Sequence, residues 1–275
     1  MSSGEIRSTK EDTVKRGKLI SLAVLVALTI FIQILVKGKS ESITGIIIVA
    51  LVYLVSVFLG LIWAFNFEVK IKSLPYLFFS SLFVMSEYLF VQLFFAQRFS
   101  RIYEGLILLL LVGLVFVGTY VSFLMANVFN VNLYKEIPLV HVGRTTSYII
   151  STFSIFFLTF SFLALQLPIY ILIPLVYPIY LFIPFIHLKN LGIEGLLLKR
   201  KSILISFLVL FMFIGSFLAG LVHEALALSP MVGYFVGMGV GNIDSKKKGF
   251  QWELILYIIA LIVVVFINLQ LNIFA

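Results

Sequence analysis

The chain contains no cysteine and few charged residues. Without cysteine, disulfides, thiolate metal sites and cysteine nucleophiles are all excluded. Charged side chains make up only 12% of the 275 residues, whereas an ordinary soluble domain carries about 25%. Hydrophobic residues reach 62%, which is more apolar surface than a soluble protein of this size can bury. Lipid as the surrounding solvent removes the difficulty, so the composition predicts an integral membrane protein.

The apolar residues are grouped into long runs separated by short polar stretches. A helix needs about 20 apolar residues to cross a hydrocarbon core of about 30 Å, and the sequence predicts eight such spans. They are Leu19–Val36, Ile43–Phe65, Leu74–Phe95, Gly105–Phe129, Ser147–Leu167, Ile169–Ile186, Ser202–Leu221 and Leu254–Leu271. We therefore expect an all-α, polytopic transmembrane helical bundle, with a short flexible polar tail (residues 1–18) and one transmembrane domain (residues 19–275).

The segment Ala225–Ile243 leaves two interpretations open. It is apolar and uncharged over 19 residues. Ser229 followed by Pro230 is typical of a helix N-cap and first helical residue. A helix that began at Pro230 would be about 20 Å long, which favours a re-entrant half-helix. The alternative is a ninth span, which would improve the distribution of positive charge across the membrane.

Basic residues give the chain a formal net charge of +8, and they lie in short loops beside the apolar runs. This pattern is typical of topology signals and of contacts with anionic lipid headgroups. If the N-terminus lies on the cytoplasmic side and the chain has eight spans, 13 of the 20 Lys and Arg residues lie on the cytoplasmic side. With nine spans, 16 of the 20 lie on that side. The sequence thus predicts a cell membrane protein, with a prokaryotic plasma membrane favoured by the composition. No basic domain is available to bind nucleic acid. Homo- or hetero-oligomers stay open as partners.

Glu87 is the sharpest feature of the sequence, because an ionisable group deep inside a span is costly and by default marks a functional site. Ser80 lies seven residues earlier, near the same helical face, and Gln92 lies closer to the end of the span. Glu87 could carry a proton or bind a cationic group. The alternative is a protonated carboxyl that hydrogen-bonds a hydroxyl on a neighbouring helix and holds the two helices together.

The fifth predicted span is rich in hydroxyl groups. Ser151, Ser154 and Thr159 belong to a series of serines and threonines at helical spacings, which predicts a polar face toward the interior of the bundle. Such a face could line a hydrated path. Small polar residues at these spacings also let helices approach closely and hydrogen-bond to one another.

Prolines and glycines mark two further segments. The motif PIYILIP recurs as PIYLFIP, so that Pro174 and Pro178 predict a bent or broken sixth span, which is either a hinge or a packing kink. Gly233, Gly237 and Gly241 form overlapping GxxxG patterns, which favour close helix packing. Phosphate binding is the alternative for these glycines, but their spacing matches neither nucleotide-binding fingerprint.

Histidines could supply interfacial chemistry. The predicted topology places His223 and Glu224 near the outer end of the seventh span, His141 and Arg144 in an inner loop, and His187 at an inner helix end. The membrane would separate His223 from the other two histidines, so we expect no metal site, and no cofactor motif is present. His223 and Glu224 could still act as an acid and base pair at the outer surface, and His141, Arg144 and His187 could cluster at the inner surface.

Two functional hypotheses follow. The first is a small permease or transporter, in which Glu87, the serine and threonine face and the proline-rich sixth span would form a central path. The second is a membrane enzyme or assembly factor that acts on lipid-linked substrates at one surface, with the histidines as its site. An accessory subunit of a membrane complex, without a site of its own, is the third possibility.

Overall fold

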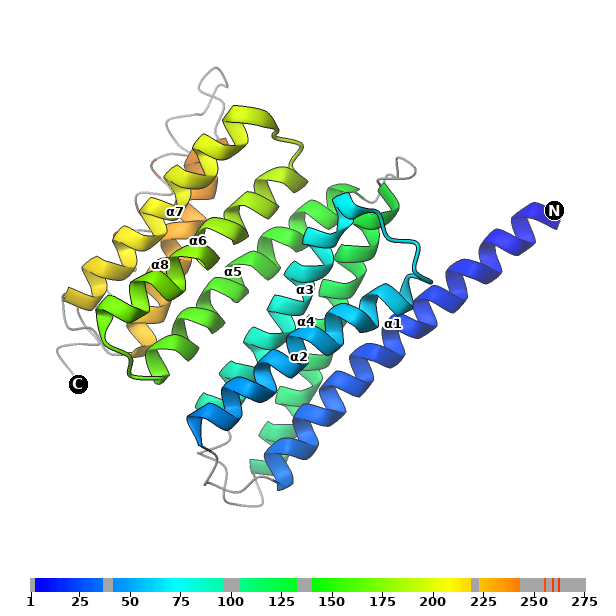
Figure 1. The fold of residues 1–275 in the computed structure, drawn as a ribbon, viewed down its shortest axis with the longest axis horizontal. Coiled ribbons are helices and arrows are strands. Elements are labelled where there is room, and N and C mark those ends of the chain that lie inside the picture. Colours follow the sequence, from blue (N-terminus) through cyan, green and yellow to red (C-terminus); the bar gives the residue numbers. More distant parts are fainter. Residues whose placement is uncertain are drawn as a thin grey trace. The chain divides into compact units, whose positions relative to one another are not determined.

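The computed structural model is all-α over the residues that it describes, which are 3–36, 42–95, 104–132, 140–218 and 223–242, together with Ile255, Ile259 and Ile262 (Figure 1). The elements are α1 (Ser3–Val36), α2 (Ile43–Ala64), η1 (Ile71–Ser73), α3 (Leu74–Phe90), η2 (Val91–Phe95), α4 (Glu104–Asn132), α5 (Val140–Ala164), α6 (Ile169–Asn190), α7 (Gly195–Leu218) and α8 (His223–Asn242). The element η1 is a 3₁₀ turn and η2 is a π-helical turn that directly continues α3.

Seven helices are long and apolar enough to cross a membrane, and they correspond to the first seven predicted spans. Large apolar side chains cover the outside of these helices, as Leu28, Leu51 and Leu109 illustrate. A continuous helix satisfies its own backbone hydrogen bonds, which lipid cannot do. The chain is therefore a multi-pass membrane protein. The eighth predicted span, Leu254–Leu271, lies outside the described residues apart from three isolated positions.

Three helices begin earlier than the hydropathy pattern predicts. α1 begins at Ser3, so the polar tail is helical where the sequence suggests flexibility. α5 begins at Val140, which places His141 and Arg144 in its first two turns and not in a loop. α7 begins at Gly195, seven residues before the predicted seventh span begins at Ser202. Once a helix is nucleated, each further residue adds one hydrogen bond, and the helix extends beyond its apolar stretch.

Prolines do not break the helices in which they occur. α6 is continuous although it contains Pro174, Pro178 and Pro184, so the sixth span is not broken, and the alternative of a bend at these prolines stays a prediction. α8 begins at His223 and continues through Pro230, so the predicted helix start at Ser229 is also wrong. A proline removes one hydrogen bond from the ladder, and neighbouring helices keep such helices intact in membranes. At 20 residues, α8 is about 30 Å long, although its apolar part is shorter than that of the seven spans.

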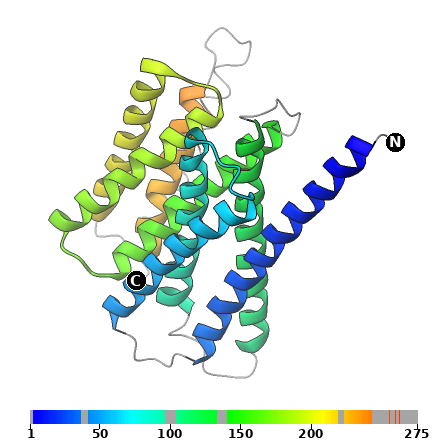
Figure 2. The ribbon, with the colours of Figure 1, turned by 45° about the vertical axis from the view of Figure 1, so that its right-hand side comes forward.

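The helices form two compact units, residues 1–150 and residues 151–275, and each is described by itself. The boundary falls within α5. In unit 1, α2 packs on α3, α1 packs on α4, and α3 packs on α4. The N-terminal turns of α1 extend beyond the other helices of this unit (Figures 1 and 2). An ion pair of 2.6 Å between Lys15 Nζ and Glu68 Oε2 ties α1 to the turn that follows α2.

α3 is the central helix of unit 1. Within its span 78% of the residues are buried, compared with 28% in each of α1, α2 and α4. Leu77, Phe79 and Val84 are fully buried among these helices. A helix that is enclosed on all sides can carry a polar group without exposing it to lipid, so α3 is the element on which unit 1 can hold a polar site.

Unit 2 is built by packing of α6 on α7 and of α7 on α8. Gly233 and Gly237 lie on the side of α8 that faces α7. A Cβ atom added at Gly233 would lie 3.0 Å from Met212 Cγ and 3.3 Å from Val209 Cα, and one at Gly237 would lie 3.2 Å from Ile205 Cγ2. The glycines thus permit the close approach of the two helices, as small residues do in membrane proteins. The side-chain surroundings of Gly241 lie outside the described residues.

The packing of α8 on α7 predicts that Gly233→Val lowers the free energy of unfolding by about 1–3 kcal/mol, because the new side chain overlaps Met212 and the backbone of Val209. Thermal unfolding in detergent, followed by tyrosine and tryptophan fluorescence, measures the change. Gly215→Val is the control, since no heavy atom lies within 4 Å of a Cβ at Gly215 on α7. Equal stability of the two variants would contradict the close approach.

Candidate functional site

A buried carboxyl group lies between α3 and α4 in unit 1. Glu87 is only 5% exposed, and the hydroxyl group of Thr119 donates a hydrogen bond of 2.8 Å to its Oε2 atom. Thr119 lies at the midpoint of the span Gly105–Asn132, so Glu87 contacts α4 near the middle of the span of that helix.

The second oxygen of this carboxyl group faces a glycine. A Cβ atom at Gly118 would overlap Glu87 Oε1, and it would lie 3.4 Å from Cε1 of Phe83. The absence of a side chain at Gly118 is thus what leaves room for the carboxyl group against α4. Thr119 and Gly118 are not among the site residues predicted from the sequence, although a Gly-Thr pair in the middle of an apolar span is a visible signal.

Ser80 makes a second polar link between the same two helices. Its hydroxyl group donates a hydrogen bond of 2.8 Å to the carbonyl oxygen of Ser122. Ser80 precedes Glu87 by seven residues, which is two helical turns, so both side chains face α4. The structure brings these two predicted residues to one interface, and hydrogen bonds to α4 occur at both.

Two tyrosines extend the polar region from α3 toward α2 and α1. The ring of Tyr88, next to Glu87 in the chain, stacks on the ring of Tyr53 with 4.7 Å between the centroids. Tyr53 lies at the midpoint of α2, and its hydroxyl group donates a hydrogen bond of 3.2 Å to the amide oxygen Oε1 of Gln33 on α1. We call Gln33, Tyr53, Tyr88, Glu87 and Thr119 the mid-span polar layer, after Tyr53 and Thr119, which lie at the midpoints of their spans. Its tyrosines are not among the residues predicted from the sequence.

Gln92 lies in the π-helical turn η2, one turn beyond Tyr88. Its side chain is only 4% exposed, and its Nε2 atom has no hydrogen-bond partner within the described part of the chain. Single π-helical turns inside α-helices occur frequently at functional sites, because they shift side chains out of the regular α-helical register. The irregular turn and the buried amide therefore lie directly beside the mid-span polar layer.

Ser151, Ser154 and Thr159, which belong to the predicted hydroxyl face of α5, lie in unit 2. Ser151 and Ser154 are fully buried, and Ser151 Oγ has no hydrogen-bond partner among the described residues. Thr159 shares a hydrogen bond of 2.7 Å with Tyr180 of α6. This bond links α5 to α6 in the way that polar residues often link membrane helices. A continuous path from Glu87 to these residues stays a prediction.

The histidine residues are distributed over both units. His141 is exposed in the first turn of α5 and Arg144 is half-buried one turn later, both in unit 1. His187 is buried in unit 2, where its ring meets the ring of Tyr234 edge-on at 6.4 Å. The backbone of His223 and Glu224 opens α8, and their side chains lie outside the described residues. Within the described part of the chain, no group of three His, Asp or Glu side chains could hold a metal ion.

The mid-span polar layer combines one acid, two phenols, one hydroxyl and one amide in apolar surroundings. An ionised carboxylate is costly at this depth unless a cation or water accompanies it. The carboxyl group of Glu87 accepts its hydrogen bond from the hydroxyl group of Thr119. Glu87 therefore meets a neutral hydroxyl group and not a cation. Such a carboxyl group can hold helices together, and it can also take up and release a proton when water reaches it.

Comparisons with known proteins add no relative to this description. No family model matches the chain, and no curated protein and no solved structure matches it.

The fit of Glu87 against α4 predicts that Gly118→Ala lowers the free energy of unfolding by about 1–3 kcal/mol, because the new methyl group displaces the carboxyl group from Thr119. Gly113→Ala is the matched control on the same helix, since no heavy atom lies within 4 Å of a Cβ at Gly113. That control should be neutral or stabilising by up to about 1 kcal/mol, because alanine favours helix.

A double-mutant cycle identifies the carboxyl group as the cause. In a Glu87→Ala background the carboxyl group that a Cβ at position 118 would overlap is absent. The loss of unfolding free energy caused by Gly118→Ala should then fall toward the effect of Gly113→Ala. Chemical or thermal unfolding of the four proteins in detergent gives the coupling energy. Additive effects of Glu87→Ala and Gly118→Ala would show that the two residues do not touch.

Proposed function

We propose that the protein is a small membrane permease in which Glu87 takes up and releases a proton during transport. The observation that carries this proposal is a carboxyl group that is 5% exposed, lies near mid-span and is bound to the hydroxyl group of Thr119. Intramembrane ionisable residues are typical of proton relays and of substrate pathways. A neutral hydroxyl partner can accompany either protonation state, since it can donate to a carboxylate or accept from a carboxylic acid.

Helix packing alone does not require an acid at this position. Ser80 joins α3 to the carbonyl oxygen of Ser122 on α4 with a hydroxyl group only. A second serine or threonine at position 87 could do the same without the cost of desolvating an ionisable group. Packing between α3 and α4 therefore does not explain why position 87 carries an acid, whereas a role in proton transfer does.

The surroundings of Glu87 support movement of a solute or of water nearby. The π-helical turn η2 follows within one turn, and Gln92 on it holds a buried amide nitrogen without a partner among the described residues. An unsatisfied buried amide is costly and is often explained by water or by a ligand. A hydrated site beside Glu87 would satisfy Gln92 and would also give the carboxyl group a route to exchange its proton.

The enzyme hypothesis receives less support from the described residues. It requires a polar cavity with histidines at the level of the lipid headgroups. His187 instead packs with its ring against Tyr234 in unit 2, and His141 is exposed on the first turn of α5. The hydrogen-bonded acid in unit 1 is a more specific observation than either histidine, and so the permease is preferred.

The proposal predicts that Glu87→Gln abolishes proton-coupled flux while the protein stays folded, because glutamine keeps the acceptor for Thr119 but cannot exchange a proton. Proteoliposomes loaded with a pH-sensitive dye are challenged with amino acids, sugars, organic cations and metal ions. The wild type should change the internal pH with at least one solute class. Glu87→Gln should reduce that rate by about a hundredfold or more, as removal of a proton-transfer group does.

Ser80→Ala is the matched control, since it removes a hydrogen bond from the same interface without removing the acid. Its flux should stay close to that of the wild type even where its unfolding temperature falls. If Glu87→Gln and Ser80→Ala lower stability alike and neither alters flux, Glu87 is a packing group. A wild-type protein that moves no proton with any solute class would also contradict the proposal.

A further inference from the structure

The turn between α2 and α3 in unit 1 has an unusual backbone. Asn66 and Phe67 both have positive φ angles, 56° and 62°. The N–H of Asn66 donates to the carbonyl oxygen of Trp63 and the N–H of Phe67 to that of Ile62, at 3.0 Å each, which is a common way to end a helix when glycine or asparagine comes first. For a bulky residue such as Phe67, a left-handed backbone is an outlier. The turn therefore stores strain at a position where glycine would cost less.

Side chains of two other helices hold this turn in place. Lys18 of α1 donates a hydrogen bond of 2.5 Å to Oδ1 of Asn66. Lys15, also on α1, forms its ion pair with Glu68. Asn130 of α4 donates a hydrogen bond of 3.0 Å to the carbonyl oxygen of Glu68. The protein itself thus fixes the shape of the turn.

The turn exposes two large apolar side chains. Phe67 is 73% exposed and Ile71 is 85% exposed. The residue that follows a left-handed helix end commonly packs back on its own helix, but the ring of Phe67 does not. Neither packing nor backbone preference explains a phenylalanine at this position. Contact with a molecule outside the bundle does explain it.

The position of the turn along α2 indicates which molecules surround it. The bond from Phe67 to the carbonyl oxygen of Ile62 returns the chain to the last turn of α2, where Trp63 is 46% exposed. Tryptophan at the end of a span is typical of the membrane interface, a layer of about 5–8 Å on each side of the hydrocarbon. Nζ of Lys18 lies 4.8 Å from the centroid of the Trp63 ring, as a basic side chain that extends toward the headgroups does. The neighbours of Phe67 at this level are phospholipids.

The charge of the turn selects among phospholipids. Lys70 and Lys72 are exposed on it, and Lys18 contacts it from α1. Its acid, Glu68, is already paired with Lys15. The turn therefore presents net positive charge at the level of the headgroups, where lysines attract anionic lipids.

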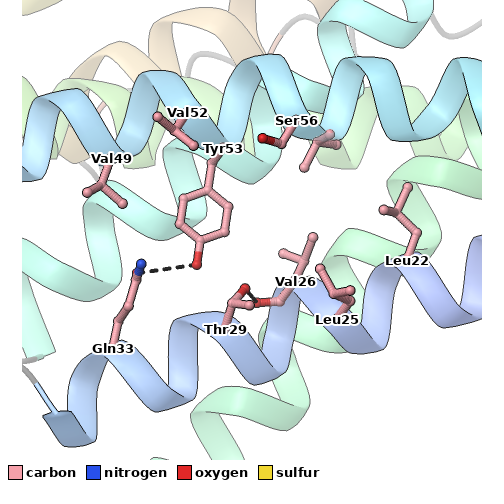
Figure 3. Close-up of a pocket in the computed structure, with 10 residues that line it drawn as sticks. Leu22, Leu25, Val26, Thr29, Gln33, Val49, Val52, Tyr53 and Ser56 are labelled. Atoms are coloured by element: carbon pink, nitrogen blue, oxygen red, sulfur yellow. Dashed lines mark hydrogen bonds between the residues drawn. The ribbon is translucent and has the colours of Figure 1, made fainter.

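A pocket of about 300 Å³ lies between α1 and α2 and begins close to this turn (Figure 3). Leu22, one helical turn from Lys18, lines it together with apolar residues such as Leu25 and Val52. None of the described residues that line it is charged. The lining selects no particular apolar molecule, so recognition lies in the charged turn and the pocket supplies only room for an acyl chain.

We propose that the turn between α2 and α3 binds an anionic phospholipid, with its phosphate held by Lys18 and Lys72 and its upper acyl chains against Phe67 and Ile71. The proposal assigns one lipid site to named side chains, which the charge pattern of the loops does not do. It also goes beyond the proposed transport, because it needs no titration of Glu87. Its test measures lipid binding and not flux, so the two proposals fail independently.

Trp63 is a reporter at the site, and in a Trp252→Phe background it is the one tryptophan of the chain. The protein is reconstituted into phosphatidylcholine vesicles with rising fractions of phosphatidylglycerol whose acyl chains carry bromine near the headgroup, since bromine quenches tryptophan on contact. Comparison with brominated phosphatidylcholine gives the relative binding constant of the two lipids beside Trp63. Phosphatidylglycerol should bind about five- to thirtyfold more tightly, as two lysine contacts predict.

Two substitutions at one position test the role of charge. Lys72→Gln removes an exposed charge of the turn and should reduce the preference for phosphatidylglycerol about fivefold. Lys72→Arg keeps the charge and should bind as the wild type does. Equal preference in the two variants, or no preference in the wild type, would overturn the site.

The source of the phosphate is tested by competition. An excess of inorganic phosphate should quench and displace no more than sodium chloride of equal ionic strength, because the free ion lacks the acyl chains that contact Phe67 and Ile71. Displacement of phosphatidylglycerol by inorganic phosphate alone would mean a site for free anions and would contradict the lipid assignment.

The surroundings of Phe67 are tested with two further variants. Phe67→Trp, in a chain with Trp63→Phe and Trp252→Phe, should emit at shorter wavelength than tryptophan in water and be quenched by the brominated lipids. Emission as in water, without quenching, would show a turn that faces water and suits a soluble partner, against the proposal. Phe67→Gly should raise the unfolding midpoint by about 1–4 °C, because it relieves the strained backbone. A lower midpoint would mean that the ring packs within the protein, which the proposal does not allow.

Discussion

A polar group of this chain that lies within the hydrocarbon is costly unless it has a partner inside the protein or a bound water, since lipid offers none. The backbone meets this demand by forming helices. Many hydroxyl groups meet it within their own helix, as Ser81 does by donating to the carbonyl oxygen of Leu77 and Ser202 to that of Leu198. Glu87 cannot, because its carboxyl group accepts from Thr119 on another helix. The acid thus makes the α3–α4 interface specific.

Small residues let the helices approach one another closely, as is common in membrane proteins. Gly118 gives the carboxyl group of Glu87 its place, Gly60 admits Leu22, and Gly233 lies against Val209. α1 and α2 contact each other closely at Leu22 and Gly60. Beside this contact a pocket lies between the two helices. The stack of Tyr53 on Tyr88 then joins this pocket to the helix that carries Glu87.

Hydropathy located the seven described spans because an apolar run of about 20 residues has few stable alternatives in lipid. It did not locate the helix ends. Val140 and Gly195 begin α5 and α7 well before their apolar stretches, since a helix propagates through polar residues once it is nucleated. The predicted break at Pro178 and the predicted helix start at Pro230 were wrong for a related reason. A sequence shows the hydrogen bond that a proline removes, but not the neighbouring helices that keep the rest of the helix together.

The sequence by itself determined that this is a multi-pass membrane protein and that Glu87 is an ionisable residue within one of its spans, because long apolar runs and their interruptions are visible in the sequence. Only the tertiary structure decided that Thr119 and Gly118 receive the carboxyl group and that Tyr53 pairs with Gln33. The physical reason is that helical periodicity fixes which residues share a face of one helix. Which faces meet depends on packing between helices, and uncharged partners such as threonine and tyrosine leave little trace in a hydropathy pattern.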